Sequence, residues 1–584
     1  MNENARRGGR WLFGLLVMLS PVLLLAPSLQ NGWYADDYIH RARLLPGPTL
    51  PSSLEHPCEW ERGSVLCAAM HLFVFVDDSP GRLETMTQAG VLPWWRAESL
   101  QMAFWRPLSG LTHWLDYQLW PDAPLAMHAH NLLWVMAAVA AAGFTLRGLI
   151  DDAVAWRVAW LLYALHEGLG AAAWIAARNS YISACLGFLA LGFLLRWAKG
   201  KGRFNQVGFA IALLACWLSA EAGIAVLGYV VAYVLLTRDR EKHCRWRPLL
   251  IAAVALMAWQ AVYRMMGYGA QATSLYTEPF TAPWQSLQAL AIHYLPLMGK
   301  LTLTSALLPM PFVMAGVGAL VGVAAWPVLR RNWTMRFGLL GSALALVPAC
   351  WHGWPLEENR LLALPALGWC TVLAVWCVAE WRANRGQAEG LLKGAGVRLM
   401  VAGLATLGTA GMGGWQIWNH ATDIQHEQRE LEASITFPAI RQTEESSWLL
   451  LSAPSSAWHF FSAYVNAYTG EAVTNRALIL TTSHAGQLGR VDESEWRLSS
   501  QQGILGKRGD WIWRDPSRSF AIGEEYRLGR WLVVIEALTP DGIPKQVRLI
   551  TKGSADETNS RFARWRLGRY EAIEELPIGE TTGW

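Results

Sequence analysis

The chain carries a long series of apolar segments, each close to the length that crosses a lipid bilayer. The first is 11–29, and ten more follow after residue 126. These later segments are 127–147, 154–176, 180–197, 205–220, 222–236, 249–268, 312–329, 336–352, 361–380 and 397–418. A transmembrane helix needs about 20 predominantly apolar residues, so the sequence predicts a polytopic α-helical membrane protein with about eleven transmembrane helices.

The composition agrees with this prediction. Of the 584 residues, 53% are hydrophobic and 16% are charged, whereas about a quarter of the residues are charged in an average soluble domain. The 34 tryptophans fit as well, because amphipathic rings collect at membrane–water interfaces. The net charge of +4 is small and spread over loops, so we expect a lipid bilayer and no nucleic acid as partner.

Basic residues mark alternate loops between the segments, at 196–203, 238–247 and 382–398. Such residues concentrate on the cytoplasmic side, so we expect a cytoplasmic N-terminus and an external or periplasmic C-terminus, with a bacterial inner membrane as the location. Segment 286–310 is also apolar, but counting it as a span would place the basic residues at 330–336 outside. We therefore expect it to be an interfacial or re-entrant stretch on the outer side.

Four consecutive regions are expected. Residues 1–29 form the first transmembrane helix, 30–125 the first external loop with interfacial helices, 126–418 the transmembrane bundle and 419–584 an external soluble domain. Short β-type runs in the last region, separated by Gly, Pro and Asp, indicate strands. These runs are 448–451, 477–482, 511–513, 531–538 and 547–551. The fold class is therefore a helical membrane protein with a C-terminal soluble α+β domain.

Two of the eight cysteines, Cys58 and Cys67, lie in the first long polar loop. If that loop faces an oxidising compartment, they are candidates for a disulfide, and the alternative is two free thiols. Most of the other cysteines lie inside apolar segments, where they act as small core side chains.

The acidic pair Asp36 and Asp37 follows the first apolar segment directly, among Trp33, Tyr34 and Tyr38. Aromatic rings of this kind settle in the headgroup layer. Carboxylates in this position are either solvated loop residues or groups that act on a molecule at the bilayer surface.

Other polar side chains recur at the outer ends of the spans. They are Arg106, Asp116, His128, Asn131, Arg178, Glu221, His352, Glu358 and Arg360. Each has an ordinary structural explanation, such as an ion pair between Arg106 and Asp116, a packing role for His128 or a helix cap at Glu221. Ionisable groups beside a bilayer are costly, however, and usually have partners or a function. Their gathering on one side predicts an outward-facing polar site.

Five stretches in order resemble the GT-C superfamily of membrane glycosyltransferases. They are ADDY at 35–38, FWRPLSGLTHWLDYQLW at 104–120 with HAHN following, AAAWIAARNSYIS at 171–183, CWLSAEAG at 216–223 and ENRLLALPALGWC at 358–370. The chain is similar to the protein O-mannosyltransferases, and especially to the branch that carries C-terminal TPR repeats, although it has no TPR array. It also departs from the pattern at His166 and Glu167, which are displaced, and at Asn359, where the family has Glu.

The resemblance implies a GT-C-like bundle that transfers a sugar from a polyprenyl-phosphate carrier to an acceptor on the outer face, with inversion at the anomeric carbon. Asp36 or Asp37 would act as general base, since an acceptor hydroxyl is a poor nucleophile. Arg360 and Arg178, with Arg106 third, would stabilise the leaving phosphate through the planar guanidinium fork. The 286–310 stretch would line the groove for the isoprenoid tail. A divalent metal is possible, but no ligand spacing demands one, and no other cofactor is expected.

Two alternatives stay open at this point. One is a flippase or another transporter of lipid-linked sugars, although paired, interrupted spans in two matching halves are not evident. The other is a GT-C scaffold without activity, whose C-terminal domain binds a glycan or a protein. The sugar and the acceptor, which could be a glycan, a lipid or a protein, are not specified by the residues.

Overall fold

The computed structural model describes residues 3–45, 54, 63–237, 245–302, 310–385, 394–435, 447–469, 477–506, 508–551 and 560–584. The chain forms two compact units. The first unit is built from Met1–Gly32, Trp105–Gly267 and Thr277–Gln425. The second unit is built from Trp33–Phe104, Tyr268–Tyr276 and His426–Trp584. Both are therefore made from segments that are far apart in the sequence.

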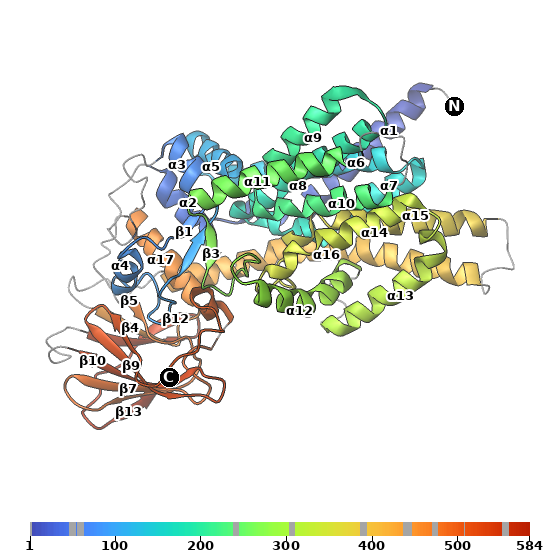
Figure 1. Cartoon of the computed structure of the whole chain (residues 1–584). Helices are drawn as coiled ribbons and strands as arrows, with labels where there is room; N and C mark the ends of the chain where they lie inside the picture. The colour runs from blue at the N-terminus through green and yellow to red at the C-terminus, as the bar shows by residue number, and fades with distance from the viewer. Residues whose placement is uncertain are drawn as a thin grey trace. The chain divides into compact units, whose positions relative to one another are not determined.

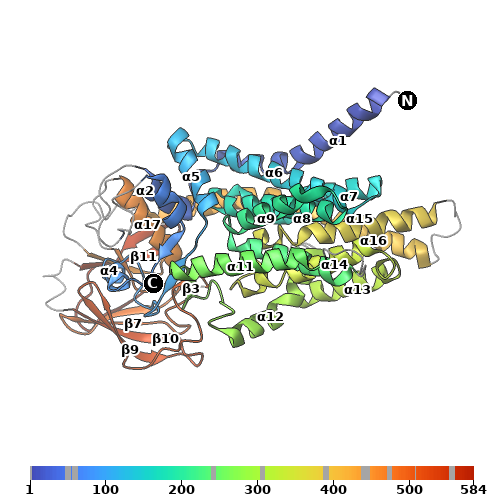
Figure 2. The ribbon, with the colours of Figure 1, turned by 45° about the horizontal axis from the view of Figure 1, so that its top comes forward.

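The first unit is a bundle of α-helices, seen from two directions in Figures 1 and 2. Helices occupy most of the expected apolar segments, because a helix satisfies its backbone hydrogen bonds internally. The helices are α1 Glu3–Leu24, α5 Pro107–Leu119, α6 Pro124–Leu149, α7 Ala153–Ala164, α8 Arg178–Ala198, α9 Gly202–Trp217, α10 Val226–Leu236, α11 Arg247–Met265, α12 Pro283–Thr302, α13 Pro311–Leu329, α14 Trp333–Ala345, α15 Ala366–Asn384 and α16 Gly394–Ile435.

Four helical stretches among the described residues are long and apolar enough to cross a membrane. They are Pro124–Leu149, Ile175–Ala198, Arg247–Met265 and Trp333–Trp351. Shorter apolar helices are Trp11–Leu24, Glu221–Leu236 and Val313–Leu329. The chain is thus an integral membrane protein, and the total of about eleven spans remains a prediction.

One expected span, 154–176, is broken in the structure. Helix α7 ends at Ala164, and the 3-10 turns η3 (Glu167–Ala173) and η4 (Ile175–Ala177) follow. The His166 ring accepts the backbone N–H of Gly168 at 3.1 Å, which caps the first turn. Helix α16 passes so closely that a Cβ added to Gly413 would lie 2.2 Å from the Leu165 carbonyl oxygen. The break therefore brings polar backbone and two ionisable side chains, His166 and Glu167, into the bundle.

Two other 3-10 turns lie between α14 and α15. They are η6 (Pro348–Trp351) and η7 (Asn359–Leu362), and they flank the polar loop 352–358. Helix α12 covers most of the stretch that we expected to be interfacial or re-entrant, and residues 303–309 of it lie outside the described part of the chain. Its C-terminal half packs tightly on α13, where a Cβ on Gly299 would lie 2.3 Å from the carbonyl carbon of Met314.

The second unit contains three sheets. Strands β1 (Val74–Val76), β2 (Gln101–Ala103) and β3 (Gly269–Gln271) form a small antiparallel sheet. A six-stranded antiparallel sheet has the order β13-β6-β7-β10-β9-β8, and a four-stranded sheet the order β12-β11-β4-β5. Their bounds are β4 Ser447–Leu451, β5 Ala477–Ile479, β6 Gln487–Arg490, β7 Glu495–Ser499, β8 Glu525–Leu528, β9 Trp531–Leu538, β10 Pro544–Thr551, β11 Ser560–Arg566, β12 Arg569–Ala572 and β13 Thr581–Gly583.

The four-stranded sheet contains a parallel βαβ element. Leu449 of β4 pairs in parallel register with Leu478 of β5 and with Phe562 of β11. Helix α17 (Ser456–Thr469) makes the crossover from β4 to β5. Three further helices of this unit, α2 Asp36–Leu44, α3 Val65–His71 and α4 Arg82–Gln88, come from the first external loop.

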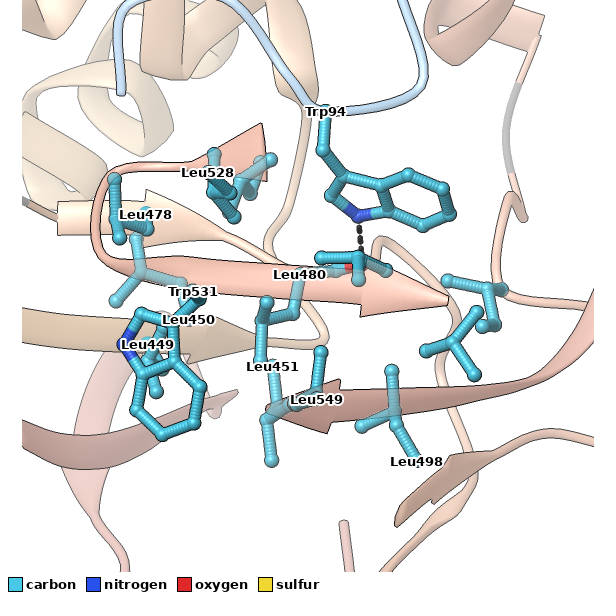
Figure 3. Packing of buried hydrophobic residues seen from close by; sticks show 14 of the residues in the cluster. Trp94, Leu449, Leu450, Leu451, Leu478, Leu480, Leu498, Leu528, Trp531 and Leu549 are labelled. Carbon is cyan, nitrogen blue, oxygen red and sulfur yellow. Dashed lines mark hydrogen bonds between the residues drawn. The ribbon is translucent and has the colours of Figure 1, made fainter. Parts of the chain in front are cut away.

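The first external loop also completes the core of the β-rich region. Trp94 and Trp95 are 1% and 0% exposed and belong to one apolar cluster with Leu449, Leu480 and Trp531 (Figure 3). The Trp94 indole N–H donates to the Leu480 carbonyl at 3.0 Å, and that of Trp95 to the Asp510 carbonyl at 3.1 Å. Backbone hydrogen bonds add to these contacts between the two segments.

The four consecutive regions expected from the sequence remain a prediction. Within the second unit, residues 33–104 share a core with residues 426–584, because Trp94 and Trp95 belong to the same apolar cluster as the strands. One expected strand is also absent, since 511–513 lies in the 3-10 turn η8 (Arg508–Trp513). Cys67 is disulfide-bonded. Cys58 lies outside the described residues, so its pairing with Cys67 remains a prediction.

Candidate functional site

Helix α2 carries the acidic pair at its N-terminus, where carboxylates interact favourably with the helix dipole. Asp37 is 1% exposed, and its Oδ2 accepts the backbone N–H of Tyr34 at 3.0 Å. Asp36 is only partly buried. The two acids therefore differ: Asp37 closes the first turn of the helix, and Asp36 is the one that a second molecule can reach.

The backbone directly before this pair is strained. Ala35 has φ of 49° and ψ of −115°, in the region with positive φ that residues with a Cβ avoid. Such outliers persist only where the surroundings hold them, and they concentrate at functional sites. Tyr38, one residue after the pair, has its pKa raised by burial and then by Glu432 and Asp37. The start of α2 is thus a constrained and partly desolvated place for a carboxylate.

In the helical unit, Arg178 lies at the centre of a buried network. Its guanidinium is 0% exposed and pairs with Asp116 at 2.5 Å. Its Nε donates to Asn131 Oδ1 at 2.5 Å, and its Nη atoms donate to the carbonyls of Thr112 at 3.3 Å and Met127 at 3.1 Å. Every nitrogen of the fork therefore has an acceptor inside the protein. This geometry suits a residue that joins α5, α6 and α8.

His130 belongs to the same network, and we had not singled it out from the sequence. Its Nδ1 lies 2.5 Å from Asp116 Oδ1, and its Nε2 lies 3.1 Å from the indole nitrogen of Trp134. Because an indole only donates, Nε2 is the acceptor, and the network assigns the ring proton to Nδ1. The HAHN stretch could have indicated His130, because it contains a second histidine two residues after His128. His128 is 1% exposed and contacts the Gly32 carbonyl at 3.3 Å.

Arg106 and Glu221 form a second pair in this unit. The Arg106 Nε lies 2.7 Å from Glu221 Oε2, and the two side chains are 11% and 24% exposed. The start of α5 also contacts the segment before Glu221, because Ser109 Oγ donates to the Ser219 carbonyl at 2.8 Å. Asp116, which the sequence offered as a partner for Arg106, pairs with Arg178 instead. The Arg106 guanidinium is partly exposed beside the Glu221 carboxylate.

A third group surrounds Arg360. Its Nε lies 2.8 Å from Glu358 Oε2, and its side chain is 16% exposed. The guanidinium also lies 5.5 Å from the ring centroid of Trp174. Arg360 holds the pKa of Glu358 below its usual value, against the effect of burial. His352 accepts the N–H of Trp354, and burial lowers the pKa of its ring to about 4, so it is neutral near pH 7.

Lys300 and Glu167 extend this third group. Lys300 is 1% exposed, and its Nζ donates to the Leu356 carbonyl and, at 2.5 Å, to Asn359 Oδ1. Glu167 is also 1% exposed, and neither of its carboxylate oxygens has a hydrogen-bond partner among the described residues. A buried ammonium thus contacts the loop that carries Arg360, and the buried Glu167 carboxyl group lies in the same helical unit.

Contacts join these groups into one network within the helical unit. Trp174 is the link, because its ring lies under Arg360 while its carbonyl accepts the Asn131 amide at 2.9 Å. The nine site residues expected besides the acidic pair therefore fall around two charged centres, Arg178–Asp116 and Arg360–Glu358, with Arg106–Glu221 attached through α5. The guanidinium groups of Arg360 and Arg106 are partly exposed, whereas that of Arg178 is 0% exposed.

A divalent metal was a possibility from the acids alone. Among the described residues there is no group of three or more His, Cys, Asp or Glu side chains that could hold a metal ion. The Lys300 ammonium already occupies the position from which a cation would approach Asn359 and the Leu356 carbonyl.

No family model and no curated protein matches the chain. Among solved structures, the chain is similar to the crystal structure of ArnT from Cupriavidus metallidurans in the apo state, with 15% sequence identity and a TM-score of 0.43, over 81% of this chain and 90% of that chain. ArnT bound to undecaprenyl phosphate is similar over the same shares, with 14% identity and a TM-score of 0.38. Likeness at this level leaves the activity to be argued from the residues themselves.

Proposed function

We propose that the protein is a membrane glycosyltransferase of the GT-C type, which moves a sugar from a polyprenyl-phosphate-linked donor to an acceptor on the non-cytoplasmic face. The observation that carries the proposal is the network of ionisable side chains built into the helical unit around Arg178–Asp116 and Arg360–Glu358. Charged groups in an apolar bundle are costly and are kept for a function. The five sequence stretches that resemble GT-C enzymes supply most of these residues.

Arg360 and Arg106 are the proposed phosphate ligands. Each has a guanidinium that is partly exposed and partly neutralised by one carboxylate, with Nε–O distances of 2.8 Å and 2.7 Å. A guanidinium fork binds phosphate oxygens through two parallel hydrogen bonds, so an incoming phosphate can share it with the resident carboxylate. We assign Arg178 the supporting role of fixing the positions of α5, α6 and α8.

Asp36 is the proposed general base. It would accept the proton of the acceptor hydroxyl as that oxygen attacks the anomeric carbon, and the polyprenyl phosphate would leave as an anion. A positioned base contributes typically about 10²–10⁴-fold to the rate. Partial exposure favours Asp36 over Asp37, which is 1% exposed. Inversion of the anomeric carbon and transfer of a hexose follow from the family resemblance and belong to the proposal.

The test is transfer by the purified protein in liposomes that contain a hexosyl undecaprenyl phosphate, with a cell-envelope extract as the source of acceptor. Mass spectrometry would measure the release of undecaprenyl phosphate and the mass added to acceptors. We expect transfer by the wild type and a loss of about 10²–10⁴-fold in Asp36→Asn. Asp37→Asn serves as the paired comparison. Its loss of transfer activity should be no larger than its loss of folded protein.

Two results would overturn the proposal. Movement of the intact donor across the bilayer without release of undecaprenyl phosphate would identify a transporter. Transfer at the wild-type rate by Asp36→Asn, with normal membrane insertion, would remove this acid from the mechanism.

A further inference from the structure

The C-terminal domain is joined to the acid-bearing helix by buried contacts within the second unit. Arg43, on the last turn of α2, is 3% exposed and faces α17, with its guanidinium carbon 6.0 Å from the ring centroid of Tyr464. Its Nη1 donates to the carbonyls of His71 at 3.1 Å and Leu72 at 3.2 Å. One buried cation thus ties the end of α2 to α17 and to the end of α3.

The other end of α2 is held by the last part of α16. The Tyr34 hydroxyl donates to Glu427 Oε2. The Trp33 ring lies under Arg41, whose guanidinium carbon is 4.0 Å from the ring centroid. Asp36 lies between these two attachments, one residue after the strained Ala35. The geometry at Asp36 therefore depends on residues beyond 425.

The parallel sheet gives a second, independent indication. In open α/β sheets, ligands bind at the carboxyl ends of the parallel strands. Here that edge is filled by the chain itself. Trp94 donates to Leu480, directly after β5, and Trp95 donates to Asp510, whose carboxylate accepts Ser456 Oγ at 2.9 Å at the start of α17. The first external loop therefore occupies the place where a soluble α/β domain would bind a ligand.

We infer that the C-terminal domain is the positioning element for helix α2, acting through Arg43 and Tyr464, and that it sets the orientation of Asp36 for the transfer step. The inference rests on the proposed function, because it assigns Asp36 the role of base. A displacement of about 1 Å at a reacting group can cost about 10²-fold in rate. Weakening the contacts that hold α2 in place should therefore lower kcat and leave donor binding in the helical unit unchanged.

The test compares Arg43→Met with Arg490→Met in the liposome assay. Arg490 is a matched control on β6 of the six-stranded sheet, because it is 8% exposed, lies 5.3 Å from the Trp496 ring centroid and pairs with Glu575 at 2.9 Å. We expect Arg43→Met to lower kcat by about 10- to 100-fold with the KM for hexosyl undecaprenyl phosphate within about twofold. Arg490→Met should keep kcat within about twofold of the wild type, although it too removes a buried cation.

Equal losses of kcat in both variants at equal losses of thermal stability would overturn the inference, since the domain would then act only through folding. A raised donor KM with unchanged kcat would overturn it as well. If Arg43→Met yields no folded protein, Tyr464→Leu takes its place, because it removes the ring that lies 6.0 Å from the Arg43 guanidinium carbon. It should lower kcat by about threefold or more, and an unchanged kcat would count against the inference. Full transfer by Asp36→Asn would instead refute the proposed function.

Discussion

The insertion of Trp95 into the core of the second unit gives the sharpest prediction about stability. Trp95 is 0% exposed, and its indole donates to the Asp510 carbonyl at 3.1 Å. Truncating a buried Trp to Ala costs about 3–5 kcal/mol, and a buried acceptor left without its donor costs a further ~1–3 kcal/mol. Trp95→Ala should therefore lower the stability of the unit by about 4–8 kcal/mol.

The reference variant is Trp496→Ala, which removes a similarly buried ring, 3% exposed, from β7 of the same core. Its indole nitrogen has no hydrogen-bond partner among the described residues, so only the packing loss of about 3–5 kcal/mol applies. Trp95→Ala should thus destabilise the C-terminal domain at least as much as Trp496→Ala. Trp284→Ala, at a ring that is 68% exposed on α12, should have no effect.

The assay is pulse proteolysis of the full chain in detergent across a urea series, with cleavage followed in the region beyond residue 447. A loss of 4 kcal/mol corresponds to a fall of about 8–16 °C in Tm for a unit of this size, which a thermal series would check. The reasoning fails if Trp95→Ala leaves the C-terminal region as resistant as in the wild type. It fails equally if residues 426–584 expressed alone resist cleavage as well as they do in the full chain.

A further prediction concerns the group around Arg360. Lys300→Met should cost about 3–5 kcal/mol, because it leaves the Leu356 carbonyl, Asn359 and the Glu167 carboxylate without their cation. The double variant with Glu167→Gln should cost less than the sum, and strict additivity in a double-mutant cycle would contradict the coupling.

Hydropathy predicted most of the helical unit, because each span is a local property of about 20 residues. It missed the break after Ala164, which depends on the ring of His166 and on the approach of Gly413 from a distant helix. The prediction of a strand at 511–513 was wrong for a related reason. Trp513 is buried by tertiary contacts, and its indole donates to Ser456 Oγ at 3.0 Å. Apolar runs of three residues do not specify a strand.

The candidate site shows the same division between local and distant information. Residue types and their placement near span ends picked out Arg178, Asp116 and Arg360, and the structure gives each of them an ion pair. The sequence did not predict which of the charged side chains form ion pairs with each other. Arg106 and Asp116 are ten residues apart along a helix, which separates them by about 15 Å, so Arg106 pairs with Glu221 from another part of the chain. Lys300 is defined by contacts to Leu356 and Asn359 that no local pattern carries.

The shared core of residues 33–104 and 426–584 has a consequence for biosynthesis. Trp95 leaves the ribosome about 350 residues before the strands that bury it, counted to β4 at 447. At about 5–20 residues per second, that interval is roughly 20–70 s. During this time the tryptophan-bearing segment lacks the strands that bury it, while the helices that follow it are inserted one after another. Its protection from proteases and from self-association falls to chaperones, so depleting them should deplete this protein before other membrane proteins whose soluble domains are encoded in one stretch.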